Sequence, residues 1–224
     1  MKHISILTGA GISAESGVKT FRDHDGLWEG HDVMQVATPQ AFEKNPGLVL
    51  DFYNKRRQQL LAVQPNLAHQ RLVDLETQFN VDIITQNVDD LHERAGSSQV
   101  THLHGELMKV RSTFDHRLIY NWKKDLNLGD FCEHHHQLRP HVVWFGEAVP
   151  MIEKAIDILK QTDVLIIIGT SMQVYPAAGL IDFAPSSTPI YFIDPTPSIS
   201  ESTDEHIYSE KSTTSLVKLM QQLL

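Results

Sequence analysis

Residues 4–17 read Ile4-Ser5-Ile6-Leu7-Thr8-Gly9-Ala10-Gly11-Ile12-Ser13-Ala14-Glu15-Ser16-Gly17, a short apolar run that breaks into small residues. The apolar run predicts a buried strand, and the small residues predict a turn into a helix. Gly9, Gly11 and Ala14 stand at the G-x-G-x-x-A spacing that lets a backbone approach a pyrophosphate at a helix N-terminus. The same pattern also fits an ordinary Gly-rich turn between a strand and a helix.

The residues after this turn distinguish two kinds of dinucleotide site. A nicotinamide dehydrogenase has a second strand that ends in Asp or Glu about 20 residues further on and holds the ribose hydroxyls. Here residues 20–28 show no strand pattern. The sequence therefore favours dinucleotide binding and disfavours hydride transfer.

The composition limits the class of protein. No apolar run approaches the roughly 20 residues of a membrane span, and the first residues do not resemble a signal peptide. The single cysteine, Cys132, excludes an intramolecular disulfide. The formal net charge of −9 disfavours general nucleic-acid binding. We expect a cytoplasmic protein with neither a membrane nor a nucleic acid as partner.

Strand and helix patterns alternate along most of the chain. Apolar runs predict strands at 4–8, 81–85, 100–103, 164–168 and 190–193, and apolar periodicity predicts helices at 46–61, 66–79, 150–160, from 176 and at 213–223. This alternation predicts an α/β fold with a doubly wound parallel sheet. Polar clusters follow the strands at 9–17, 86–90, 104, 169–171 and 194, so one crevice at the carboxyl ends of the strands would gather them. Between 107 and 139 short β-like pieces replace the alternation and predict a small inserted module.

The helix at 46–61 carries an arginine on its apolar stripe. Val49, Phe52, Tyr53 and Leu60 form the stripe, Arg56 falls on it, and Lys55 and Arg57 are turned away from it. A guanidinium on an apolar face needs an anionic partner. Either an internal carboxylate pairs with Arg56, or Tyr53 and Arg56 line a pocket for an acidic ligand.

Six motifs follow one another over nearly the whole chain: Gly9-Ala10-Gly11-Ile12-Ser13, Phe21-Arg22, Thr85-Gln86-Asn87-Val88-Asp89, His102-Leu103-His104-Gly105, Val143-Trp144-Phe145-Gly146-Glu147 and Gly169-Thr170-Ser171. Together they resemble those of the sirtuins, the NAD-dependent protein-lysine deacylases. The resemblance implies a large Rossmann-like NAD-binding domain (1–106 and 140–224) and a small module (107–139), with a peptide cleft between them.

The resemblance also implies the reaction. In sirtuin chemistry NAD+ is consumed as a co-substrate: the acyl oxygen of an acyl-lysine attacks C1′ of the nicotinamide ribose, and nicotinamide, O-acyl-ADP-ribose and free lysine are released. His104 matches the histidine that acts as general base on a ribose hydroxyl, a role that suits an imidazole. His102 matches no catalytic role, and we expect it to be structural.

The resemblance assigns binding roles to further residues. Those expected at NAD are Gly9, Ala10, Gly11, Ser13, Glu15, Phe21, Arg22, Trp28, Gln86, Asn87, Asp89, Gly169, Thr170, Ser171, Asp194 and Ser212. Asp194 stands where the family commonly has asparagine, and a carboxylate still accepts hydrogen bonds from ribose hydroxyls. Those expected at the substrate peptide, by strand addition, are Val143, Trp144, Phe145 and Gly146.

Tyr53 and Arg56 match the Tyr-x-x-Arg pair of the desuccinylase-type branch, where they hold the distal carboxylate of succinyl- or malonyl-lysine. An arginine fork and a phenol hydroxyl are suitable carboxylate partners. The resemblance therefore favours the pocket interpretation of Arg56. We expect removal of succinyl and malonyl groups, and of acetyl groups as well.

The small module departs from the family pattern. Four thiolates normally hold a structural zinc there, but only Cys132 is present and Ser112 stands near the place of the first ligand. A mixed site of Cys132, His116, His134 and His136 has an unorthodox spacing, and we expect no structural zinc of the usual kind. An apolar core would replace the metal, built around Leu118, Tyr120, Trp122, Leu126 and Phe131.

Two other functions stay open at this point. A mono-ADP-ribosyltransferase or NAD hydrolase would use the same cleft. A non-catalytic NAD-binding module is a third possibility, against which the intact His104 and Asn87-Val88-Asp89 argue. Protein targets and oligomeric state do not follow from the sequence.

Overall fold

The computed structural model describes residues 1–19, 27–28, 31–197 and 205–223. Phe21 and Arg22, both expected at NAD, lie outside the described residues. Trp28 is described only as backbone, in the two-stranded sheet of β2 (Leu27–Trp28) and β3 (His31–Asp32). No helix in the described part of the chain has both the length and the apolar character that a membrane span requires.

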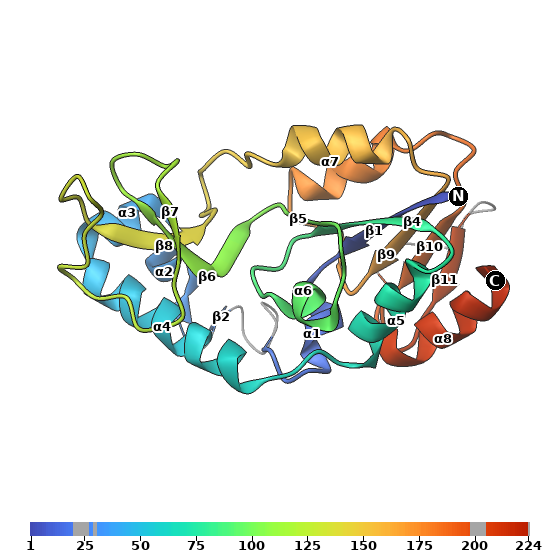
Figure 1. Ribbon diagram of the computed structural model, residues 1–224, viewed down its shortest axis with the longest axis horizontal. Coiled ribbons are helices and arrows are strands. Elements are labelled where there is room, and N and C mark those ends of the chain that lie inside the picture. The colour runs from blue at the N-terminus through green and yellow to red at the C-terminus, as the bar shows by residue number, and fades with distance from the viewer. Residues whose placement is uncertain (20–26, 29–30, 198–204, 224) are drawn as a thin grey trace.

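A six-stranded parallel sheet forms the larger part of the molecule (Figure 1). Its strand order is β11-β10-β9-β1-β4-β5, and every neighbouring pair is parallel. The strands are β1 (His3–Thr8), β4 (Asn80–Thr85), β5 (Val100–His102), β9 (Val164–Ile168), β10 (Ile190–Ile193) and β11 (Glu205–Tyr208). The predicted parallel sheet is confirmed, and β11 adds an edge strand that was not predicted.

Helices cover both faces of this sheet, as the doubly wound fold requires (Figure 1). On one face lie α1 (Ala10–Ala14), α5 (Leu67–Leu75) and α8 (Ser212–Leu223), packed through Ile12, Leu72 and Leu216. On the other lie α7 (Ile152–Leu159) and the 3₁₀ helix η1 (Ala177–Phe183). The short helix α6 (Leu91–Ala95) ends at Gly96, whose φ of 112° is the left-handed conformation expected of a helix C-cap.

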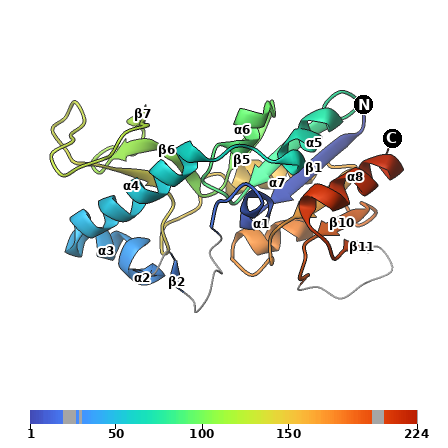
Figure 2. The same cartoon turned by 90° about the horizontal axis from the view of Figure 1, so that it is seen from below.

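A second unit lies at the end of the molecule opposite α8 (Figures 1 and 2). Its antiparallel sheet has the order β7-β6-β8, from β6 (Gly105–Ser112), β7 (Ile119–Asn121) and β8 (Leu138–Val142). Three helices lie beside it: α2 (Val33–Val36), α3 (Pro39–Lys44) and α4 (Pro46–Ala62). The predicted module, 107–139, falls within this unit, and its boundaries stay a prediction.

Helix α4 has two buried faces, which its sequence pattern did not indicate. Tyr53 lines the cavity described below and packs against Phe52, whereas Leu50 and Asn54 contact the small unit. Arg57, although turned away from the apolar stripe, does not reach solvent: its Nε donates to the carbonyl of Leu107 (3.2 Å) and its Nη1 to Asn54 Oδ1 (2.7 Å). Burial, opposed by the charge of Asp125, lowers the pKa of Arg57 to about 10.

The small unit has an apolar core, as expected, but with a different membership. Leu126 is at its centre, and Leu118, Tyr120 and Trp122 pack against it. Phe131 was wrongly placed there, because its side chain is 55% exposed and the next residue, Cys132, points inward. Ser112 Oγ donates to Cys132 Sγ (3.3 Å). Within the described residues, no three His, Cys, Asp or Glu side chains gather as a metal site.

Candidate active site

A cavity of about 900 Å³ opens at the carboxyl ends of β1, β4, β9 and β10 and extends to α4. That volume lies within the range of small-molecule sites. It brings together the described residues that were expected at NAD, Gly9, Ala10, Gly11, Ser13, Glu15, Gln86, Asn87, Asp89, Gly169, Thr170, Ser171, Asp194 and Ser212. The same cavity is also lined by His104 and by the residues expected at the substrate, Tyr53, Arg56, Val143, Trp144, Phe145 and Gly146. Their individual roles stay predictions.

Glycines let the two loops at the floor of the cavity touch each other. A Cβ at Gly11 would lie 2.6 Å from Gly169 Cα, and one at Gly9 would lie 2.6 Å from Thr170 Cβ. Gly169 itself has a φ of +61°, and a Cβ there would meet the backbone of Ile12. The N–H of Gly11 donates to the carbonyl of Gly169 (2.8 Å). These glycines are therefore required by contact between the loops, in addition to any approach to a phosphate.

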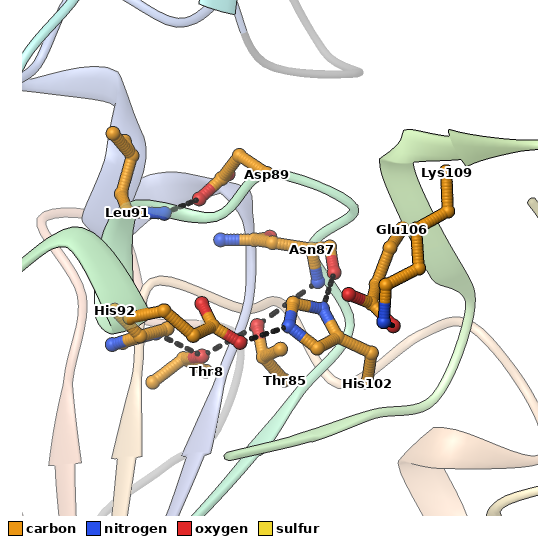
Figure 3. A network of polar contacts seen from close by, with 10 residues as sticks. Thr8, Thr85, Asn87, Asp89, Leu91, His92, His102, Glu106 and Lys109 are labelled. Atoms are coloured by element: carbon orange, nitrogen blue, oxygen red, sulfur yellow. Dashed lines mark hydrogen bonds and ion pairs between the residues drawn. The ribbon is translucent and has the colours of Figure 1, made fainter. Parts of the chain in front are cut away.

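The loop 86–89 is tied to the start of α1 by buried polar side chains. Asn87 Nδ2 donates to the carbonyl of Gly9 (3.1 Å) and to Ser13 Oγ (3.2 Å), and Ser13 Oγ donates to Asp89 Oδ2 (2.9 Å). Asp89 Oδ1 accepts the N–H of Leu91 (3.2 Å), as Figure 3 shows. Burial raises the pKa of Asp89. The loop therefore presents amide and carboxylate groups from a fixed backbone.

His104 lies at the same edge of the sheet and contacts the backbone of the loop 86–89. Its Nδ1 lies 2.9 Å from the carbonyl of Gln86, which only accepts, so Nδ1 carries the proton. Nε2 of the neutral ring then has the lone pair. Burial lowers the pKa of His104, and the contact with Gln86 opposes this only in part. The ring is therefore a neutral base at neutral pH, with its tautomer set by the backbone.

Two carboxylates, Glu15 and Asp194, line the cavity together with Ser212. Glu15 accepts from Ser212 Oγ (2.9 Å) and Thr213 Oγ1 (2.7 Å). Burial alone would raise the pKa of Glu15, but these hydrogen bonds outweigh it and lower the pKa. Asp194 Oδ1 accepts the N–H of Thr196 (2.8 Å). Carboxyl oxygens at this end are suitable acceptors for ribose hydroxyls.

The other end of the cavity is aromatic and cationic. Trp144 Nε1 donates to the hydroxyl of Tyr53 (2.9 Å), and burial raises the pKa of Tyr53 so that the phenol stays protonated. Arg139 stacks on the Trp144 ring, with its guanidinium carbon 3.3 Å from the ring centroid. Glu147 accepts from Arg139 (2.6 Å), Arg111 (3.1 Å) and the N–H of Trp144 (2.8 Å).

Two residues of this network were not found from the sequence. Glu147 closes the Val143–Glu147 motif, and a carboxylate directly after an apolar run was a usable signal. The sequence around Arg139 did not indicate its role, because only the folded structure shows that it contacts Trp144 and Glu147. Neither residue belongs to the NAD end of the cavity. Both stabilise the wall in which Tyr53 is fixed.

A parallel doubly wound sheet with Gly-rich loops at its carboxyl edge and a cavity of this size defines a dinucleotide-binding α/β protein. The model of the Sir2 family matches residues 9–176. A Helicobacter pylori protein named NAD-dependent protein deacylase is 64% identical over 195 residues, 87% of this chain and 85% of that protein.

Solved structures agree with the family model. A complex of a Sir2 homologue with NAD has a TM-score of 0.86 at 38% identity, over 99% of this chain and 89% of that one. A Sir2 complex with p53 peptide and NAD+ has a TM-score of 0.83 at 28% identity, over 98% and 92%. The chain therefore belongs to the Sir2 family, the sirtuins. It is an enzyme of the NAD-dependent protein deacylase class.

Proposed function

We propose that this enzyme removes succinyl and malonyl groups, and also acetyl groups, from lysine side chains of proteins. The observation that carries the proposal is the place of Tyr53 and Arg56. They lie one turn apart on α4 and line the same cavity as His104 and the Gly-rich loops. An acyl group that enters between them would bring its distal carboxylate to a phenol and a guanidinium.

The residues of the cavity fit NAD as co-substrate. Its floor is formed by Gly9, Gly11 and Gly169, and acceptors for hydroxyl groups stand at Asp89 and Asp194. NAD supplies an electrophilic ribose carbon and a nicotinamide leaving group. His104 Nε2 would accept a proton from a ribose hydroxyl, while Nδ1–H stays bound to Gln86. The buried amide of Asn87 would orient the nicotinamide ribose.

Two properties of the pocket suit an acidic acyl group. Tyr53 is buried with a raised pKa and accepts a hydrogen bond from Trp144, so its own O–H remains a donor. Arg56 stays charged at any physiological pH. Hydrogen bonds to a charged partner contribute about 1.5–3 kcal/mol, equivalent to about 10- to 100-fold in affinity.

The test compares matched succinyl-lysine and acetyl-lysine peptides by mass spectrometry with NAD. We expect Arg56→Met to lower kcat/KM for the succinyl peptide about 10- to 100-fold. The kcat/KM for the acetyl peptide should change little. Tyr53→Phe should act in the same direction, and His104→Tyr should abolish both reactions. Lys55→Met is the matched control, because Lys55 is the exposed neighbouring cation of α4 and pairs with Asp51.

Two outcomes contradict the proposal in different ways. Equal loss for both peptides in Arg56→Met would leave a deacylase without acidic preference. Transfer of label from NAD to protein or to water, with both peptides intact, would favour an ADP-ribosyltransferase or an NAD hydrolase. The segment 143–146 at the wall of the cavity, and the Sir2 complex with p53 peptide, support an extended peptide as substrate.

A further inference from the structure

The segment 102–107 supplies hydrogen-bond donors to the backbone carbonyls of residues 85–88, at the end of β4 and in the loop that follows it. The carbonyl of Thr85 is bound by the N–H of Leu103 (2.9 Å), and that of Val88 by the N–H of Leu107 (2.8 Å). The two carbonyls between them, of Gln86 and Asn87, are bound by imidazoles. His104 Nδ1 lies 2.9 Å from Gln86 O, and His102 Nδ1 lies 3.0 Å from Asn87 O. Four consecutive carbonyls are thus held by one segment.

His102 differs from His104 in having a partner at each ring nitrogen. Its Nε2 lies 2.7 Å from Glu93 Oε1, and its Nδ1 faces the carbonyl of Asn87. A carbonyl and a carboxylate only accept, so both nitrogens must donate and the ring is an imidazolium. Only 8% of its side chain is exposed. Burial works to lower the pKa of His102, but the hydrogen bond and charge of Glu93 outweigh it, and the pKa is raised.

The charges around His102 come from three elements (Figure 3). Glu93 belongs to α6, and Glu106 and Lys109, which pair with each other at 2.8 Å, belong to β6. Asp89 comes from the loop itself, and the charge of His102 acts to lower its pKa against the effect of burial. The imidazolium therefore favours the ionised form of the carboxylate that accepts from Ser13 and Leu91.

We propose that His102 is a positioning residue for NAD: anchored by Glu93, it donates to the carbonyl of Asn87 and fixes the loop 86–89 against the start of α1. The proposal rests on the proposed use of Asn87 and Asp89 at the nicotinamide ribose. It does not depend on the acyl preference. Because His102 contacts the carbonyl of Asn87 while Ser13 accepts from its side-chain amide, loss of His102 should release the backbone that orients this amide.

The test separates the hydrogen bond to Asn87 from the charge. His102→Leu removes both, and His102→Asn keeps an amide N–H near the position of Nδ1. For His102→Leu we expect the KM and the Kd for NAD to rise about tenfold or more, with the KM for the acyl-peptide nearly unchanged. His102→Asn should recover most of the loss.

Glu93→Gln tests the charge. The amide still contacts His102, but the charge of Glu93 no longer raises the pKa of the ring, which therefore loses its proton at lower pH. In the wild type kcat/KM for NAD should fall at high pH as His102 loses its proton. Glu93→Gln should move that fall to lower pH, while the limb at low pH that belongs to His104 stays in place.

The chain offers a matched control at the other end of the sheet. His3 makes the same pair of contacts, from Nδ1 to the carbonyl of Gln161 (3.1 Å) and from Nε2 to Asp82 (2.8 Å), far from the cavity. His3→Leu should leave the KM for NAD unchanged. If His102→Leu and His3→Leu lower the melting temperature alike and neither changes the KM for NAD, His102 is merely structural and the proposal is overturned. A wild type without NAD-dependent turnover would instead refute the proposed function.

Discussion

A buried histidine pair behind the NAD loops makes stability depend on pH. His69 and His92 are both fully buried, with ring centroids 4.9 Å apart. Burial lowers the pKa of His69 from 6.5 to about 4. The pKa of His92 is also lowered, by burial first and then by the charges of His69 and His102. As the pH falls, the unfolded chain therefore binds protons before the folded one does.

The size of the effect follows from His69 alone. Its contribution to stability is fully present above pH 6.5 and is lost as the pH falls toward 4. Between pH 8 and pH 5 the difference between the two pKa values corresponds to about 2 kcal/mol of unfolding free energy. Urea unfolding at both pH values measures this loss.

The variant that isolates the effect is His69→Gln. His69 is the third residue of α5, where its Nδ1 accepts the N–H of Asn66 in a capping box. Glutamine is a preferred residue at that position, so the cap survives while the titration is removed. We expect the loss of stability from pH 8 to pH 5 to shrink by about 2 kcal/mol. The exposed His116→Gln is the control, and an unchanged loss in His69→Gln would refute the reasoning.

Two further predictions concern the walls of the cavity. Glu147→Gln should lower the unfolding free energy by about 3 kcal/mol, since it leaves its two buried arginine partners without a carboxylate, whereas the exposed Glu153→Gln should change it by less than about 0.5 kcal/mol in the same urea titration. Gly169→Ala should weaken NAD binding in calorimetry more than tenfold, because a Cβ there would lie 2.4 Å from the N of Ile12. Gly129→Ala, also at positive φ but with nothing within 4 Å of its Cβ, should leave NAD binding intact.

The strands that the sequence predicted well are those buried on both faces. β9 (Val164–Ile168) and β10 (Ile190–Ile193) occupy the predicted residues, because a central parallel strand is a continuous apolar run. The edge strand β11 (Glu205–Tyr208) has only four residues and begins with two polar ones, a pattern too short to separate from a loop.

The small unit was harder to predict because its contacts join distant segments. Arg57 is buried only because Leu107 and Asn54 receive its hydrogen bonds, and the first of these lies 50 residues away. The inward residue near 131 is Cys132 and not Phe131: the chain turns back after Cys132, whose N–H donates to the carbonyl of His136 (2.9 Å), and Cys132 packs with Leu126. The sequence shows which side chains are large and apolar, but in an irregular loop it does not show which of them faces the core.

The motif His102-Leu103-His104 shows why the site was only partly predictable. Its two histidines are chemically identical in the sequence, yet the pKa of one is raised and that of the other lowered. The difference comes from the partners: the carboxylate of Glu93 contacts His102 from α6, whereas the uncharged carbonyl of Gln86 contacts His104. A resemblance between motifs can identify the base. It takes the fold to show that the neighbouring histidine is charged, and that the charge lies beside the carboxylate of Asp89.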